Sequence, residues 1–243
     1  QGEIAVVEGD NNVYINGCTM TSGSSKRGLM MLQSGSGDAD GSNAAITISN
    51  SSLTVTGSST PLCEVPTLNN GTLTLSDVTL SVTSGILMYV DYNTQWSTYG
   101  GTGNLVLNTT QDSWTYTGNA DADSYSNINV TVGDNVTWKG AMDNDNNASS
   151  ANVTIQNGGV WVLTANSYVS TLVNNGTIHT NGYTLSYDNL TGNTPDDALG
   201  IKTISADPKN DGKIYSINGR YIGTTLPSGY HGIYIQNGRQ YYK

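Results

Sequence analysis

Short runs of alternating apolar and polar residues recur along the chain. Residues 45–57, Ala-Ile-Thr-Ile-Ser-Asn-Ser-Ser-Leu-Thr-Val-Thr-Gly, return at 72–84 as Thr-Leu-Thr-Leu-Ser-Asp-Val-Thr-Leu-Ser-Val-Thr-Ser. Because side chains alternate between the two faces of a strand, each copy predicts two short strands. Asn50 and Asp77 fall between these strands, and Asx residues favour bends and tolerate a left-handed backbone. Neither copy has enough apolar side chains for a core of its own, so the units are expected to stack.

The stacking hypothesis makes definite predictions about side chains. The apolar positions of both copies should face the interior, and the Thr and Ser residues between them should face solvent. The predicted inward positions are Ile46, Ile48, Leu53, Val55, Leu73, Leu75, Leu80 and Val82. Matched positions of later copies should also lie above one another, which places Tyr116 and Trp138 in one column.

Further copies of the strand pair follow up to residue 187, with unit lengths of about 21 to 32 residues. The variation falls in connectors rich in Gly, Ser, Asn and Asp. These are residues 34–43, 91–103, 119–126 and 141–150. A constant strand pair with a variable connector favours an all-β parallel β-helix over residues 1–192. The alternative is a β-sandwich, whose strands would be linked by hairpins at even spacing.

Composition and charge limit the kinds of protein and partner that this sequence allows. Only 12% of the residues are charged, Phe is absent, and Gly occurs 29 times. No apolar run approaches the roughly 20 residues of a membrane helix, so no membrane span is expected. Residues 1–199 hold 3 basic against 17 acidic side chains, a net charge of −14, whereas residues 200–243 hold 6 against 2, a net charge of +4. The acidic body argues against nucleic acid and anionic lipid as partners, and the change of sign predicts a boundary at 191–200.

The basic tail, residues 200–243, predicts a small antiparallel β module. Three strand-like runs fall within 213–243. Two Asn-Gly dipeptides, at 218–219 and 237–238, are typical of tight hairpin turns.

The two cysteines, Cys18 and Cys63, leave two alternatives open. They pair as a disulfide if the protein folds in an oxidising compartment. Otherwise they are small buried thiols in neighbouring units.

A catalytic site is not predicted. Lys139 is the only basic side chain between residues 28 and 201, which suits a polyanionic substrate badly. The candidate carboxylates all lie in connectors rather than on strand faces. They are Asp38, Asp40, Asp121, Asp123, Asp143 and Asp145. We therefore expect a protein that is not an enzyme and that has no cofactor.

One connector invites comparison with a calcium loop. Asp143, Asp145 and Asn147 alternate as oxygen ligands do at the start of an EF-hand loop. The turn Gly and the bidentate Glu of such a loop are replaced by Ala148 and Thr154. A weak surface calcium site and a solvated connector are the two interpretations.

Exposed aromatic residues are the candidate binding residues. Trp161 is expected to point outward between Val160 and Val162, and Trp96, Tyr92 and Tyr99 lie in a long connector. Such rings can stack on a sugar or pack on a partner protein. The alternative is local packing of the connector on its own strands.

Two resemblances bear on where the protein acts. Residues 45–190, and above all the phrase from Gly159 to Ile178, resemble passenger domains of autotransporter-type adhesins and other right-handed β-helix surface proteins of Gram-negative bacteria. The tail resembles the C-terminal module of secreted Bacteroidota proteins, related to type IX sorting domains, although it is shorter. The first resemblance implies a right-handed β-helix and a surface location, and the second implies export or attachment. A cap on the open end of the β-helix is the alternative role for the tail.

Together these features predict a secreted or outer-surface, adhesin-like protein without enzymatic activity that binds a glycan or a host or cell-surface protein. The alternatives are a carbohydrate-active enzyme of the polysaccharide lyase or hydrolase kind, a glycan-binding module, and a purely structural spacer. The oligomeric state is left open by the sequence.

Overall fold

The protein is built from β-strands. The computed structural model describes residues 2–32, 43–67, 70–92, 100–196, 212–216, 220–236 and 239–242, and these residues contain no helix. In that part of the chain, therefore, no helix is long and apolar enough to cross a membrane. The chain divides into two compact units, Gln1–Gly200 and Ile201–Lys243.

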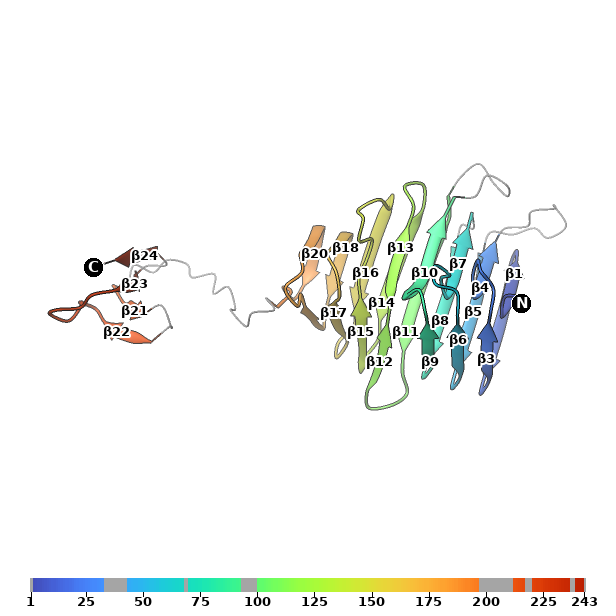
Figure 1. Ribbon diagram of the computed structural model, residues 1–243, viewed down its shortest axis with the longest axis horizontal. Helices are drawn as coiled ribbons and strands as arrows, with labels where there is room; N and C mark the ends of the chain where they lie inside the picture. The colour runs from blue at the N-terminus through green and yellow to red at the C-terminus, as the bar shows by residue number, and fades with distance from the viewer. Residues whose placement is uncertain are drawn as a thin grey trace. The chain divides into compact units, whose positions relative to one another are not determined.

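The larger unit contains four parallel sheets (Figure 1). The five-stranded sheet has the order β1 (Ala5–Glu8), β4 (Leu29–Leu32), β7 (Cys63–Pro66), β10 (Ile86–Asp91) and β13 (Asn119–Ala122). The eight-stranded sheet has the order β2 (Asn11–Asn16), β5 (Asn43–Ser49), β8 (Asn70–Ser76), β11 (Thr102–Asn108), β14 (Asn127–Val132), β16 (Ser150–Ile155), β18 (Ser167–Asn174) and β20 (Leu185–Gly192). The three-stranded sheet is β3 (Thr19–Ser22), β6 (Ser52–Val55) and β9 (Thr79–Val82), and the four-stranded sheet is β12 (Trp114–Thr117), β15 (Val136–Gly140), β17 (Val160–Leu163) and β19 (Thr177–His179).

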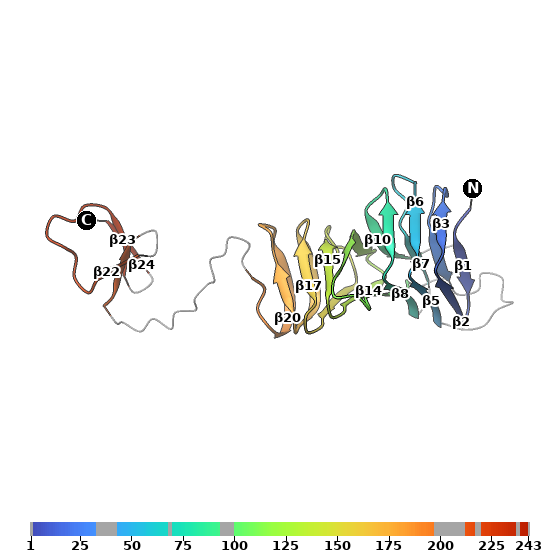
Figure 2. The same cartoon turned by 90° about the horizontal axis from the view of Figure 1, so that it is seen from below.

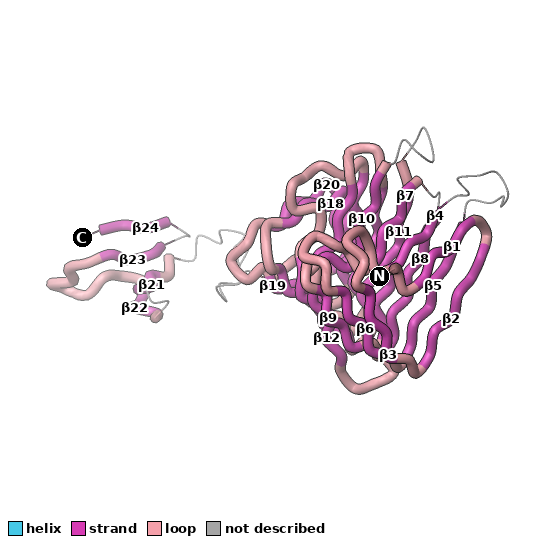
Figure 3. Tube along the Cα trace, turned by 45° about the vertical axis from the view of Figure 1, so that its right-hand side comes forward, coloured by secondary structure: helices cyan, strands magenta, loops and turns pink. Residues whose placement is uncertain are grey.

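Successive units of sequence stack in space. The first three units each add one strand to the five-, eight- and three-stranded sheets, so that β4, β5 and β6 are followed by β7, β8 and β9. Figures 2 and 3 show the result, with β2, β5, β8 and β11 lying side by side in Figure 3. Every strand pair described in this unit is parallel. Stacked parallel sheets are compatible with a β-helix and differ from the hairpin-linked strands of a sandwich.

The predicted alternation is confirmed in the core. Six of the eight predicted inward positions are at most 1% exposed. They are Ile46, Ile48, Leu53, Val55, Leu73 and Leu75. Leu80 and Val82 are only half-buried against the core, because β9 is the last strand of its sheet. The two bends are also confirmed, since Asn50 (φ 47°) and Asp77 (φ 57°) adopt the left-handed conformation.

A column of large aromatic side chains fills the core beneath the four-stranded sheet. The register aligns Tyr116 with Trp138, as predicted, and then Trp138 with Trp161 and Trp161 with Ile178. The two indoles are stacked, with ring centroids 4.9 Å apart and planes inclined by 12°. Their Nε1–H groups donate to the carbonyls of Gly118 (2.8 Å) and Gly140 (3.0 Å). The column therefore buries large apolar rings while both indole N–H groups keep a hydrogen-bond acceptor.

The outer surface of the eight-stranded sheet carries two files of uncharged side chains, mostly Thr and Asn with two Val. The first file from β8 to β20 is Thr72, Asn104, Asn129, Asn152, Thr171 and Asn189. The second is Thr74, Val106, Thr131, Thr154, Val173 and Thr191. We call these twelve residues the threonine–asparagine face.

The smaller unit holds an antiparallel sheet in the order β22 (Tyr221–Gly223), β21 (Ile214–Ser216), β23 (Ile233–Gln236) and β24 (Arg239–Tyr242). It agrees with the small antiparallel module predicted for the tail. The two Asn-Gly dipeptides, at 218–219 and 237–238, lie outside the described residues.

Cys18 and Cys63 are not paired. Both are free thiols in the structure, so the disulfide alternative is not the one seen here, and only Cys63 fits the alternative of a buried thiol, because Cys18 is exposed. The reason is topological, because Cys63 starts β7 facing the core whereas Cys18 lies before β3 in a different sheet. Burial raises the pKa of the Cys63 thiol, with a smaller contribution from Glu64, and this keeps it protonated.

Candidate functional site

The solvent side of the five-stranded sheet is the strongest candidate site. The register aligns Glu64 of β7 with Tyr89 of β10 and with Asp121 of β13. Their sequence neighbours Cys63, Val65, Met88, Val90, Ala120 and Ala122 face the core. We call the acidic face the outward residues of this sheet together with the loop that extends it: Glu64, Tyr89, Asp91, Asp121, Asp123, Asp143 and Asp145.

Three of these carboxylates converge. Asp121, Asp143 and Asp145 each place one oxygen within 4.8 Å of the others. The isolated bridge between Ala120 and Met142 brings the connector against β13. Asp143 is 3% exposed with φ 45°, and one of its oxygens accepts from the backbone N–H groups of Asn147 (2.9 Å) and Ala148 (3.0 Å).

These oxygens are of the kind that calcium prefers. The structure brings the predicted ligands Asp143 and Asp145 together, whereas Asn147 serves Asp143 as a backbone donor. The third carboxylate, Asp121, lies on strand β13, so the prediction that residues 119–126 form a connector without strand-borne carboxylates is wrong here. The spacing within the 143–147 connector could not reveal a ligand on a separate strand. Calcium binding at this position stays a prediction.

The crowded carboxylates hold protons more tightly than free side chains do. Burial raises the pKa of Asp121 to about 6, and the nearby Asp145 raises it further. Burial likewise raises the pKa of Asp91 to about 6, with a contribution from Asp123. Such perturbed groups gathered on one surface are typical of functional sites.

Arg27 lies at the Glu64 end of the acidic face and forms an ion pair there. It is only 7% exposed, and its Nη1 lies 3.0 Å from the Glu64 carboxylate while its Nε lies 3.7 Å from that of Glu3. Burial, assisted by Asp91, raises the pKa of Glu64 to about 7 even though Arg27 acts in the opposite direction. The ion pair anchors the segment before β4 to β7.

The raised pKa values predict how stability depends on pH. Between about pH 4 and pH 7 the folded protein retains protons on Glu64, Asp91 and Asp121 that the unfolded chain has released. The free energy of unfolding should therefore fall as the pH rises through this window, by about 1–3 kcal/mol once solvent screening is allowed for. Urea unfolding at pH 4.5, 6 and 7.5 measures this change in the free energy of unfolding.

The control for this dependence uses two asparagine variants. Asp121→Asn should flatten the curve, because one of the shifted groups no longer titrates. Asp134→Asn, at an exposed loop position, should leave the slope unchanged. A stability that rises from pH 4.5 to 7.5 in the unmodified protein would contradict the assignment.

A pair of tyrosines adjoins the acidic face. Tyr92 and Tyr125 have ring centroids 5.1 Å apart, and Tyr125 is 66% exposed. The two oxygens of Asp123 accept from the backbone N–H groups of Tyr92 (2.7 Å) and Tyr125 (3.1 Å). Tyr92 was predicted as a binding residue, and Tyr125, from the following connector, was not.

The remaining aromatic predictions have different outcomes. Trp161 is fully buried, so the prediction that it points outward is wrong. Its strand presents Trp161 and Leu163 to the core and leaves Val160 and Val162 half-buried on the other side. Trp96 and Tyr99 lie outside the described residues.

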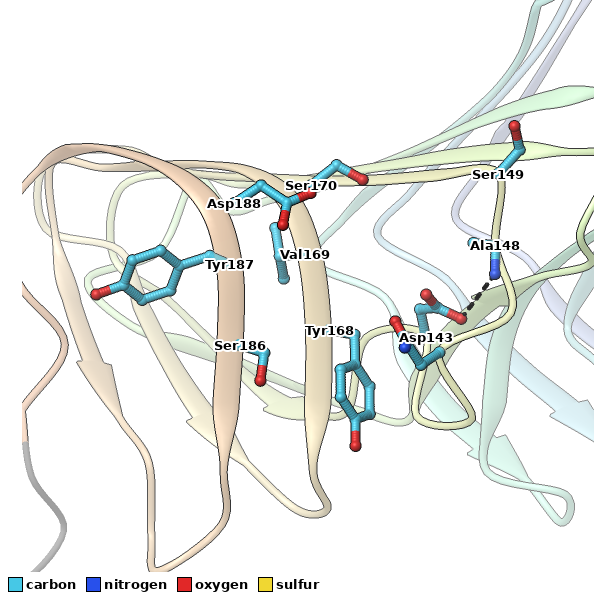
Figure 4. A pocket seen from close by; sticks show the side chains of 10 residues that line it. Asp143, Ala148, Ser149, Tyr168, Val169, Ser170, Ser186, Tyr187 and Asp188 are labelled. Atoms are coloured by element: carbon cyan, nitrogen blue, oxygen red, sulfur yellow. Dashed lines mark hydrogen bonds between the residues drawn. The ribbon is translucent and has the colours of Figure 1, made fainter.

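A hollow of about 270 Å³ lies beside the acidic face, where Asp143 forms part of its wall. Figure 4 shows Asp143 across from β18 and β20, which carry Tyr168 and Asp188. The lining is mainly polar and includes Ser149, Ser170 and Ser186. The acidic face, the tyrosine pair and the hollow thus offer carboxylates, hydroxyls and aromatic rings in one region, a donor and acceptor set suited to a polyhydroxyl ligand.

Comparison of the chain with protein-family models, curated proteins and solved structures gives no match.

Proposed function

We propose that this chain is a secreted or cell-surface, right-handed parallel β-helix that binds glycans at the acidic face without turning them over. The observation that carries the proposal is the exposed Tyr125, packed on Tyr92 and held by Asp123. An exposed ring offers an apolar surface to one face of a sugar. The neighbouring carboxylates can accept hydrogen bonds from the hydroxyl groups of the sugar.

The charge of the face limits the ligand. Asp91, Asp121, Asp123 and Asp145 would repel uronates and sulfated sugars. A neutral or amino-sugar glycan, free or displayed on a host or cell-surface protein, fits better. An adhesin-like role follows, in which the stacked sheets hold the binding region rigidly.

The tail supports a surface location for the protein. Its antiparallel sheet matches in kind the sorting-like module that the sequence resembles. On this proposal the protein is exported by a Gram-negative bacterium of the Bacteroidota, and the tail directs export or attachment.

A carbohydrate-active enzyme is the second candidate, favoured by one observation. Asp91 and Asp121 both have a pKa raised to about 6, within the range of a general acid working near neutrality. Release of reducing ends from a polysaccharide would favour the enzyme, whereas retention without product favours the binder. A structural spacer would show neither.

The test is binding of soluble neutral and amino-sugar oligosaccharides by the full chain at pH 7, measured by calorimetry after a glycan array has selected them. Tyr125→Ala should weaken binding about tenfold, equivalent to ~1.4 kcal/mol, because the stacking surface is lost. Tyr14→Ala, which removes a 78% exposed tyrosine from β2, is the matched control and should bind normally. Equal affinity of Tyr125→Ala and the unmodified protein would refute the assignment.

A further inference from the structure

The threonine–asparagine face is a second surface with its own chemistry. It lies on the eight-stranded sheet, whereas the acidic face lies on the five-stranded sheet. Adjacent parallel strands are about 4.8 Å apart, and outward residues on one strand are about 6.6 Å apart. The two files therefore present hydroxyl, amide and methyl groups on a regular grid of about these dimensions.

The two files of this face contain no charged side chain, although the protein carries a net charge of −10. Without cationic side chains they have no means of neutralising phosphate or sulfate groups. The twelve residues also include none of the Trp, Tyr and Arg anchors that dominate protein–protein interfaces; the first aromatic side chain in register with them is Tyr14 on β2, beyond Thr47 of β5. The charge pattern therefore complements an uncharged partner.

A hydrogen-bonded ladder holds part of the grid in place. The Asn129 amide donates to Asn104 Oδ1, and the Asn152 amide donates to Asn129 Oδ1, each at 2.9 Å. Asn104 in turn donates to Thr72 Oγ1 at 3.4 Å. An amide has two N–H donors and two acceptor sites on its oxygen, so each side chain in the ladder keeps hydrogen-bonding capacity for a ligand. Side chains ordered in advance lose less entropy when a ligand binds.

We propose that the threonine–asparagine face binds the ordered surface of an insoluble neutral polysaccharide. Threonine hydroxyls both donate and accept, as sugar hydroxyls do, and threonine methyl groups contact the apolar faces of sugar rings. A regular grid suits a polymer that repeats regularly over many sugar units, because many weak contacts then add together. The proposal does not depend on glycan binding at the acidic face.

The test is co-sedimentation of the full chain with microcrystalline cellulose and with chitin. Thr131 and Thr154 are neighbours in register on β14 and β16. The double variant Thr131→Lys/Thr154→Lys places bulk and charge in the centre of the grid, and we expect at least a tenfold rise in the dissociation constant for the polymer that the unmodified protein binds. Thr131→Val/Thr154→Val keeps the shape without the hydroxyls and should weaken binding severalfold.

The matched control is Thr115→Lys/Thr137→Lys. These threonines are also neighbours in register, but on the four-stranded sheet, so binding should stay within twofold. Failure of the unmodified protein to sediment with either polymer would overturn the proposal, as would equal loss in both lysine pairs. If Tyr125→Ala abolishes sedimentation and the Thr131/Thr154 lysine pair does not, the acidic face binds the polymer and this proposal fails alone.

Discussion

Replacing Trp138 by alanine is expected to lower the free energy of unfolding by about 4 kcal/mol, in the range observed for large aromatic residues in cores. Trp138 is fully buried between Tyr116 and Trp161. Its removal leaves a cavity, ends the stacking with Trp161, and deprives the Gly118 carbonyl of its indole donor. Urea unfolding followed by circular dichroism measures the loss.

Tyr14→Ala is the control for this prediction too, because the same exposed side chain can be removed from β2 without opening a cavity. It should change stability by less than about 0.5 kcal/mol. A Trp138→Ala protein as stable as the unmodified one would show that the aromatic column does not support the stack. Trp161 is buried in the same aromatic column. If a Trp161→Ala variant lost glycan binding, the cause would therefore be loss of structure rather than loss of a contact with the sugar.

Replacing Asp77 by alanine should destabilise the protein by about 3 kcal/mol. The Asp77 carboxylate, 7% exposed, accepts hydrogen bonds from the hydroxyls of Thr109 and Thr110 and from the backbone N–H of Thr110. Hydrogen bonds to a charged group contribute about 1.5–3 kcal/mol, and alanine tolerates the left-handed backbone less well than aspartate. Thermal and urea unfolding both measure the effect.

The Asp77→Asn variant separates the loss of the charged hydrogen-bond acceptor from the strain of the left-handed backbone, because asparagine tolerates the left-handed bend but carries no charge. It should lose about half as much stability as Asp77→Ala. Burial works to raise the pKa of Asp77, but the bonds from Thr109 and Thr110 outweigh it and lower the pKa below its ordinary value. The contribution of the ionised carboxylate is therefore present above the pKa of the unfolded chain and is lost as the pH falls through the lower folded pKa. Equal stability of all three proteins at pH 7 would contradict this role.

The repeat itself was readable from the sequence because its signals are local. Period-two alternation identifies the inward face of a strand wherever polar residues separate the apolar ones, as at Ile46 and Ile48. Asn50 and Asp77 mark bends by their own conformational preference. The pairing of Tyr116 with Trp138 followed from aligning one copy on the next.

Local pattern failed where it was ambiguous. Residues 160–163, Val-Trp-Val-Leu, are all apolar, so alternation permits either phase. The phase is set by the register with β15, where Trp138 lies between the polar Thr137 and Lys139 and must face inward. Alignment of Trp161 with Trp138 would have placed it correctly.

Alternation, Asx bends and repetition thus indicated from the sequence alone an all-β protein and favoured stacked parallel strands over a β-sandwich, since each signal depends on residues close together in the chain. Only the tertiary structure decided which polar groups meet. Asp121 joins Asp143 and Asp145, Arg27 reaches Glu64, and Tyr125 packs on Tyr92 because unequal connectors return the chain to neighbouring strands. Such contacts depend on inter-strand register and connector path, which residue order along one strand does not encode.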